Sequence, residues 1–432
     1  MGLDEVKYSA YLKILQEELV PAMGCTEPIA IAYAAAVAGN TLSGAPERIE
    51  VELSGNIIKN AKSVYVPNTG GLRGIKGAVA AGIIADCPHK KLEILEEITE
   101  EEQEKIAEFI ESCPIEVKEA DTSRVFEILI SVYRGCDRVR VRITDYHTNL
   151  VFIEKNGEIL LEQSRETSIN AVPAAAGDGD KKELLTAEDI ITFADTVRIE
   201  DVRELIERQI AYNMAIAEEG LRGKYGANIG SVLMQTGRED IRNKAKAMAA
   251  AGSDARMSGC SMPVVIISGS GNQGITASVP VVVYGREMKA SEEKILRAVV
   301  LSDLMTMYQK SKIGRLSAYC GVISAGCGSG AGIAYLQGGG FEEIAHAVVN
   351  GVAILSGTIC DGAKSSCAAK IAMAVEAGIL GYDMYRNGQE FYAGEGIVTK
   401  GIENTLNNIG ILATKGMKDT DSEIMKLMLA CD

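Results

Sequence analysis

The chain has 432 residues, 47% of them hydrophobic, and a formal net charge of −15 at pH 7. This length is enough for two or three domains, or for one large domain with an inserted module. The acidic balance argues against nucleic acid or an anionic membrane surface as a partner, although a local pocket can still bind a small anion.

The N-terminal region is expected to be helical. Residues 5–19 and 27–39 have the pattern of helices, the second with Thr26 as N-cap and Pro28 in its first turn. The first 20 residues lack the features of a signal peptide, and no apolar run reaches the ~18 residues of a membrane span. We therefore expect a cytoplasmic protein that does not associate with membranes.

Residues 46–166 are predicted to form an α+β module. The segments IEVELSGNII and SVYVP have the pattern of strands, and helices are expected near 74–85 and 92–111. Residues 115–163 alternate in polarity and are rich in Val, Ile and Arg, which predicts four or five short antiparallel strands, with Asn156-Gly157 as a hairpin turn.

The last part of the chain, residues 187–432, is predicted to be mostly helical and to follow a linker at 172–182. Residues 264–285 are expected to be an exception to the helices. The segment 313–375 is crowded with Gly, Ala and Ser, which suits either packing around a buried cofactor or tight helix packing. We expect an α+β fold, in which a mainly helical catalytic domain carries a smaller antiparallel-sheet α/β module, inserted after N-terminal helices (1–45) that pack on the catalytic domain.

Ten cysteines are present, and in a cytoplasmic protein a group of them is more often metal-binding or catalytic than disulfide-bonded. Cys320, Cys360 and Cys367 occur in SAYCGVISAGCGSG and GTICDGAKSSCAAK. A turn at Asp361-Gly362 would bring Cys360 and Cys367 to one site, and thiolates suit iron–sulfur clusters or zinc. The absence of any CxxC pair argues against a zinc knuckle. Spacing alone still favours buried inert cysteines.

Cys25 lies in AMGCTEPIA, one residue before the expected helix cap. The partial positive charge and free N–H groups of a helix start favour a thiolate, so a lowered pKa is expected. Cys25 is a candidate nucleophile, base or metal ligand, with a buried structural cysteine as an equal alternative. Cys327 follows Cys320 by seven residues and is a substitute candidate ligand.

Three polar motifs are candidates for holding an anionic substrate. NTGG at 68–71 resembles an anion-binding nest, GSGNQG at 269–274 is a second polar loop, and HTN at 147–149 closes a strand. A plain turn is the alternative for each loop, and His147 is as consistent with a packed strand-end residue as with a functional one. The candidate substrate-binding residues are Thr69, Gly70, Arg73, Asn149 and Asn272.

The stretches GCTEPIAIAYAAA, VPNTGGLRGIKG, HTN, SGSGNQGI, SAYCGVISAG and ICDGAKSSCAAK resemble the L-cysteine desulfidase family, which is similar to the α-chain of iron–sulfur L-serine dehydratases. The resemblance runs from about residue 20 to 380, and its GCTEP and ICDGAK motifs are the specific ones. It implies an oxygen-sensitive [4Fe-4S] cluster with three cysteine ligands and one open iron. By motif, the ligands are Cys320, Cys360 and Cys367, and the catalytic base is Cys25.

The implied reaction is the α,β-elimination of L-cysteine to hydrogen sulfide, ammonia and pyruvate, without pyridoxal phosphate. The chain lacks the serine-rich SSSSHT motif of serine dehydratases, which favours cysteine over serine as substrate. Three alternatives remain: an iron–sulfur L-serine dehydratase, a non-catalytic iron–sulfur sensor, and a pyridoxal-phosphate lyase using Lys364. A homodimer is expected, because symmetric dimers are the commonest oligomers of soluble proteins.

Overall fold

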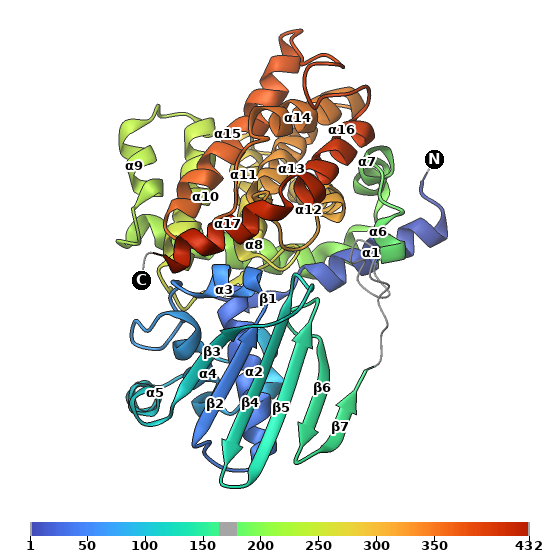
Figure 1. Cartoon of the computed structure of the whole chain (residues 1–432). Helices are drawn as coiled ribbons and strands as arrows, with labels where there is room; N and C mark the ends of the chain where they lie inside the picture. Colours follow the sequence, from blue (N-terminus) through green and yellow to red (C-terminus); the bar gives the residue numbers. More distant parts are fainter. Residues whose placement is uncertain (1, 164–178, 431–432) are drawn as a thin grey trace.

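The structure, a computed structural model, describes residues 2–163 and 179–430 and has an α+β fold (Figure 1). A sheet module, residues 26–162, forms the lower part in Figure 1, and a helical domain forms the upper part. The predicted fold class is confirmed. Most of the predicted linker at 172–182 lies outside the described residues, and its last four residues form the short helix α6 (Gly179–Lys182).

The sheet has six strands in the order β3-β2-β4-β5-β6-β7. β3 runs parallel to β2, and the other neighbours are antiparallel. The alternating residues of 115–163 do form strands, and Asn156-Gly157 joins β6 to β7 with positive φ angles, as a tight hairpin requires. The strands are β2 (Arg48–Leu53), β3 (Ile115–Glu119), β4 (Glu127–Arg134), β5 (Asp137–Thr144), β6 (Leu150–Lys155) and β7 (Glu158–Glu162).

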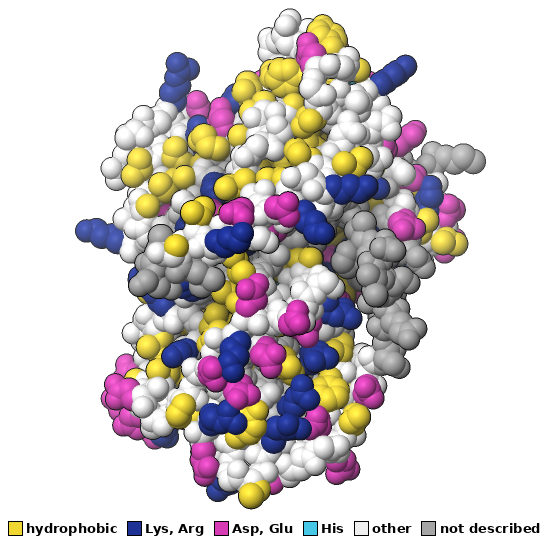
Figure 2. All heavy atoms as spheres, viewed as in Figure 1, with side chains coloured by type: hydrophobic (Ala, Val, Ile, Leu, Met, Phe, Trp, Pro, Cys, Tyr) yellow, Lys and Arg dark blue, Asp and Glu magenta, His cyan; other side chains and the backbone are white. Residues whose placement is uncertain are grey.

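The helix α2 (Thr26–Leu42) packs against β4, β5 and α4 (Gly74–Ala85), so both helices lie on one face of the sheet. Its run of buried alanines lets the backbone come close to the strands. Several predicted positions differ from the structure. SVYVP forms no strand and contains only an isolated bridge between Tyr65 and Arg73. The N-cap of α2 is Cys25, not Thr26. SGNII enters the helix α3 (Gly55–Ala61), and α5 (Glu100–Ser112) starts later than predicted because Thr99 and Glu102 form a capping box. Acidic and basic side chains are interspersed on the face of the module seen in Figure 2.

The N-terminal segment joins the two parts of the molecule. α1 (Glu5–Glu18) packs against helices of the helical domain, and β1 (Pro21–Met23) then pairs antiparallel with β8 (Pro263–Val265). α2 starts directly after this pairing, so Cys25 lies where the sheet module meets the helical domain. The predicted division of the chain after residues 45 and 166 stays a prediction.

The helical domain is built around α13 (Gly321–Leu336), which packs against α11, α12, α14 and α15. Within the described residues, no helix is both long and apolar enough to traverse a lipid bilayer. The other helices of this domain are α7 (Ala187–Thr196), α8 (Ile199–Arg222), α9 (Ile229–Thr236), α10 (Ile241–Met257), α11 (Gly271–Glu287), α12 (Glu292–Ile313), α14 (Phe341–Ile354), α15 (Ser366–Arg386), α16 (Ile402–Ile411) and α17 (Lys418–Leu429).

The small residues of 313–375 allow α13 and α15 to touch through their backbones. A Cβ placed on Gly330 would lie 2.6 Å from the carbonyl carbon and oxygen of Gly378. At this contact, tight helix packing accounts for the glycine-rich sequence.

The expectation that residues 264–285 interrupt the helices is wrong from Gly271 onward, where α11 begins. The run VPVVVYG is β-branched and suggested a strand. A fully apolar run cannot be assigned to a strand or a helix by periodicity, and here α10, α12 and α13 surround it as a buried helix.

Replacing Gly330 by Ala is expected to destabilise the protein by about 1–3 kcal/mol, because the added methyl group forces α13 away from α15. Gly357→Ala is the matched control, since a Cβ there would have no neighbour within 4 Å. Urea unfolding followed by circular dichroism measures both. Equal stability of the two variants would contradict this account of the helix contact.

Candidate functional site

Two loops that carry cysteines are held together by backbone pairing. Cys320 is the N-cap of α13, and Cys360 lies in the loop between α14 and α15. The N–H of Cys360 donates to the carbonyl of Ala318 at 2.7 Å, and the N–H of Cys320 donates to that of Thr358 at 3.1 Å. These bonds bring the two thiols together across 40 residues of sequence.

Cys367, the second residue of α15, joins this pair, so the structure places Cys320, Cys360 and Cys367 in one group. A hydrogen bond between the thiols of Cys320 and Cys360 lowers the pKa of Cys360 and raises that of Cys320. Burial raises the pKa of Cys367, and the charge of Cys360 adds to this effect. The three sulfurs therefore act on one another electrostatically.

Cys25 lies beside this group. Its side chain packs with Val64 and Met257, and Cys367 packs against the same small cluster. Burial raises the pKa of the Cys25 thiol to about 12, and the nearby positive charge of Arg256 offsets this only partly. The lowered pKa expected from the helix start is therefore wrong, because desolvation is the largest effect on this thiol.

Four long helices start around these cysteines. The N-caps of α2, α11, α13 and α15 make no side-chain hydrogen bond to their own helix. α11 and α13 start next to each other, since a Cβ on Gly321 would lie 2.7 Å from Nε2 of Gln273. Each helix start presents N–H groups outside the helical bonding pattern and a partial positive charge, so together they favour a bound anion.

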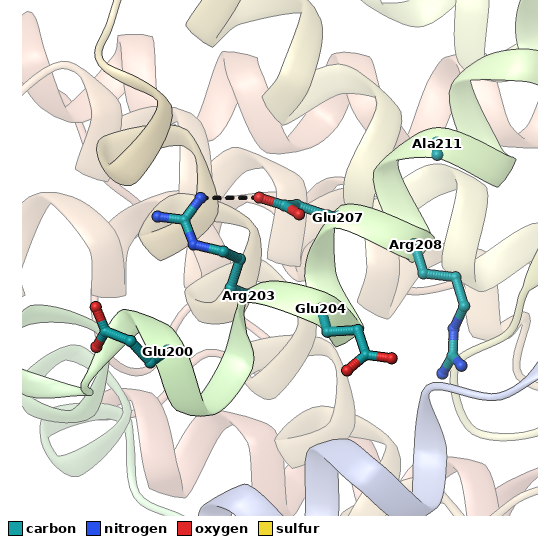
Figure 3. Close-up of a pocket in the computed structure, with 6 residues that line it drawn as sticks. All are labelled: Glu200, Arg203, Glu204, Glu207, Arg208 and Ala211. Atoms are coloured by element: carbon teal, nitrogen blue, oxygen red, sulfur yellow. Dashed lines mark hydrogen bonds and ion pairs between the residues drawn. The ribbon is translucent and has the colours of Figure 1, made fainter.

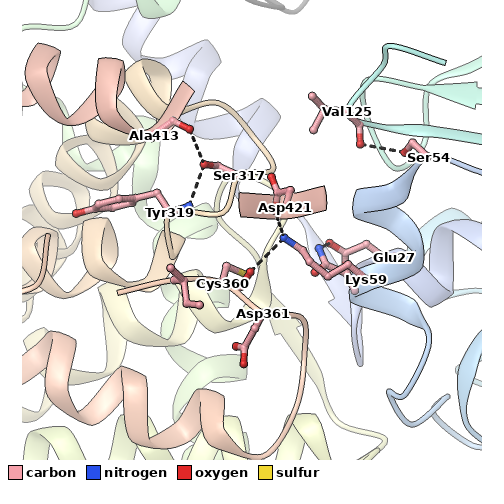
Figure 4. A network of polar contacts seen from close by, with 12 residues as sticks. Glu27, Ser54, Lys59, Val125, Ser317, Tyr319, Cys360, Asp361, Ala413 and Asp421 are labelled. Carbon is pink, nitrogen blue, oxygen red and sulfur yellow. Dashed lines mark hydrogen bonds and ion pairs between the residues drawn. The ribbon is translucent and has the colours of Figure 1, made fainter. Parts of the chain in front are cut away.

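Buried cations add to this positive charge. Lys59 of α3 reaches across from the sheet module, where its Nζ donates to the carbonyl of Cys360 at 3.1 Å and pairs with Asp421 of α17 (Figure 4). Burial lowers the pKa of Lys310 on α12 to about 8, while the charges of Cys360 and Cys320 act to raise it. Sequence reasoning missed both residues and Arg256, because a single basic residue in a helix gives no signal.

A polar network fixes the GCTEP segment. Thr26 donates from Oγ1 to the carbonyl of Gly269 at 2.7 Å, and Asn60 donates to Glu27 at 3.0 Å. Nε2 of His147 lies 4.0 Å from Oε1 of Glu27. Three motifs that are distant in sequence (GCTEP, HTN and SGSGNQG) therefore meet beside Cys25, and His147 is one of the buried residues that join them.

The candidate residues of the NTGG segment have local roles. Thr69 donates from Oγ1 to the carbonyl of Val66 at 2.8 Å, and Gly70 has a positive φ in the same turn. The guanidinium of Arg73 stacks on the ring of Tyr65 at 3.8 Å and is exposed. These contacts stabilise the turn that follows Val64, a neighbour of Cys25.

Of the other two candidate residues, Asn149 lies in a turn of the sheet, and Asn272 lies near Cys25. Asn149 donates to the carbonyl of Thr144 at 2.9 Å and stabilises the turn between β5 and β6. Asn272 accepts a hydrogen bond from Arg256 at 3.1 Å and contacts Sδ of Met257 at 3.6 Å. Of the five substrate-binding candidates, Asn272 alone has side-chain contacts to the neighbours of Cys25.

Of the two residues considered as alternatives, Cys327 lies apart from the cysteine group, whereas Lys364 lies beside Cys367 and accepts a backbone hydrogen bond from it at 2.9 Å. Cys327 lies inside α13, where its sulfur would be 2.7 Å from a Cβ on Gly351, and burial alone raises its pKa to about 12. Lys364 is partly exposed and pairs with Asp361.

The structure has a large cavity between its two parts and a smaller pocket on α8. A cavity of about 2360 Å³ between the sheet module and the helical domain has no cysteine among its described lining residues, but it is lined by Lys310, His147 and Ser268 among others and so reaches residues around the cysteine group. A smaller pocket on α8 is lined by charged side chains such as Arg203 and Glu207, and its lining contains no cysteine (Figure 3).

The donor set fits an iron–sulfur cluster better than a single ion. In the described ranges, no three His, Cys, Asp or Glu side chains form a site for one metal ion. A cluster takes each thiolate at a different iron, so its ligands need not surround one point. Soft thiol donors among helix starts and buried cations suit a group that is itself anionic.

In protein prepared without iron, iodoacetamide at pH 8 is expected to modify Cys25 at least about a hundredfold more slowly than the exposed Cys136, because a buried thiol with a pKa near 12 is almost entirely protonated. Peptide mapping by mass spectrometry measures the two rates. Similar rates at both cysteines would contradict the burial of Cys25.

Comparison with known proteins places the chain in a family. The family described as "Serine dehydratase alpha chain" matches residues 89–426. A UPF0597 protein of Desulfitobacterium hafniense is 57% identical over 98% of this chain and 97% of its own length. UPF0597 proteins of Lachnoclostridium phytofermentans and Treponema denticola are 46% and 43% identical, over 98% and 99% of this chain and 100% of their own lengths. The chain therefore belongs to the serine dehydratase alpha chain family.

Proposed function

We propose that the protein is an iron–sulfur L-cysteine desulfidase, which converts L-cysteine to hydrogen sulfide, ammonia and pyruvate. The observation that carries the proposal is the meeting of Cys320, Cys360 and Cys367 with Cys25 in one buried, positively charged region. Membership of the serine dehydratase alpha chain family supports a lyase that eliminates a group from the β-carbon of an amino acid.

We assign Cys320, Cys360 and Cys367 as the residues that hold a [4Fe-4S] cluster. When bound, such a cluster supplies a Lewis-acidic iron that polarises the substrate. Lys59 and Lys310 lie near these sulfurs and stabilise negative charge there.

We assign Cys25 as the group that accepts the α-proton on its Sγ. Thr26 and Glu27 hold the GCTEP segment through the network with Gly269 and Asn60, which fixes the thiol beside Cys367. A thiol with a pKa near 12 is protonated at neutral pH, so Cys25 acts as a base only when further positive charge lies beside it.

L-Serine is the alternative substrate, and the family match favours it, because the family's description names serine. The absence of the SSSSHT motif favours cysteine. A sensor that binds a cluster without turnover is the third possibility.

We also propose that the protein is cytoplasmic and forms a homodimer. The cysteines in the described ranges are all free, as in a reducing compartment.

Anaerobic purification followed by iron and sulfide counting and by assays on both amino acids tests the proposal. We expect about four iron and about four sulfide per chain, with pyruvate formed faster from L-cysteine than from L-serine. Faster turnover of serine would make the protein a serine dehydratase. A cluster without turnover of either amino acid would support the sensor.

Replacing Cys360 by Ala is expected to remove most of the iron and all measurable activity, because one thiolate ligand is lost. Cys136→Ala, at an exposed position, is the control and should keep both. Iron counting and the pyruvate assay follow both variants. Normal iron content in Cys360→Ala would count against this ligand.

Replacing Cys25 by Ser is expected to keep most of the iron while lowering kcat at least about a hundredfold, because a hydroxyl is a much weaker base than a thiolate. The same two measurements apply. If Cys25→Ser loses its iron, Cys25 is instead a ligand. If kcat is unchanged, Cys25 is not the base.

A further inference from the structure

Arg256 is a buried cation held against the start of α11. It lies in the last turn of α10, with 4% of its surface exposed, and donates from Nη1 to Asn272 Oδ1 at 3.1 Å. A Cβ on Gly271 would collide with Nε of Arg256. The glycine at this position of the GSGNQG motif therefore leaves room for the guanidinium.

Among the described residues, the charge of Arg256 has no ion-pair partner. A guanidinium carries five N–H donors, and here Nε is buried without an acceptor. The charge of Arg256 acts instead on the thiol of Cys25. A buried cation without a counter-charge is costly, so this arrangement favours a bound anion.

Gln273 has a buried acceptor without a donor, whereas Arg256 has a buried donor without an acceptor. It is 5% exposed, and its Oε1 accepts no hydrogen bond. Its amide lies against Gly321, the residue after Cys320. An unused acceptor on Gln273 therefore lies beside the residue that follows Cys320, and an unused donor on Arg256 lies near Cys25.

We propose that Arg256 binds the α-carboxylate of the amino acid substrate and that Gln273 accepts a hydrogen bond from its α-ammonium group. An α-amino acid carries an anion and a donor on one carbon, which matches these two unsatisfied groups. Asn272 positions the guanidinium through its amide oxygen. This inference rests on the proposed function, because it names the residues that hold the substrate of that reaction.

Two thiols that each lack one half of the amino acid head group test the two roles separately. 3-Mercaptopropionate keeps the carboxylate without the amine, and cysteamine keeps the amine without the carboxylate. Calorimetric titration of the anaerobic, iron-loaded protein measures their dissociation constants independently of turnover. Iron content is determined for every variant.

Arg256→Gln is expected to weaken binding of 3-mercaptopropionate roughly ten- to a hundredfold and to leave cysteamine binding unchanged. Gln273→Met should weaken cysteamine alone. Arg256→Lys should keep the iron and bind 3-mercaptopropionate with intermediate affinity, because an ammonium lacks the paired donors of a guanidinium. Arg222→Gln, at an exposed position, is the control and should bind both compounds normally.

Wild-type affinity for 3-mercaptopropionate in iron-loaded Arg256→Gln would overturn the role of Arg256. Loss of iron in both Arg256 variants would also overturn it, because Arg256 would then support the cluster. If the wild-type protein binds both thiols as expected but releases no sulfide from L-cysteine, the proposed function fails and the head-group site stands.

Discussion

The structure depends on one electrostatic constraint: uncapped helix starts and the guanidinium of Arg256, whose Nε has no acceptor, bring positive charge to one buried place. The starts of α2, α11, α13 and α15 converge there without side-chain caps. Lys310 and Arg256 lie among them, almost fully buried. The thiols of Cys25, Cys320 and Cys367, whose pKa values are raised, do not balance this charge. Thiolates on an anionic cluster and an amino acid carboxylate would do so.

The sheet module contributes to this site although it carries none of the three grouped cysteines. α2 lies on one face of the sheet and carries Cys25 at its start, and the pairing of β1 with β8 holds that start against the helical domain. Lys59 on α3 crosses the same boundary to the carbonyl of Cys360. A movement between the two parts would therefore change the surroundings of Cys25 directly.

Local patterns predicted much of the fold. The alternation of 115–163 gave the strands, and Asn156-Gly157 gave a turn, because both are decided by neighbours in sequence. The helix α11 was not predicted, because its apolar run owes its conformation to the helices that surround it. Likewise the role of Arg256 was not predicted, because its guanidinium packs against Gly271, a contact that only the tertiary structure shows. The prediction of a lowered pKa for Cys25 was wrong for the same reason, since the burial of its thiol depends on residues distant in sequence.

The most direct test of the central claim is a crystal structure of the protein purified without oxygen, with iron located by its anomalous scattering. The account predicts iron bonded to Sγ of Cys320, Cys360 and Cys367, with Cys25 beside an iron that has no protein ligand. Iron bonded elsewhere in the chain, or three cysteines that remain without iron when iron is present, would contradict it.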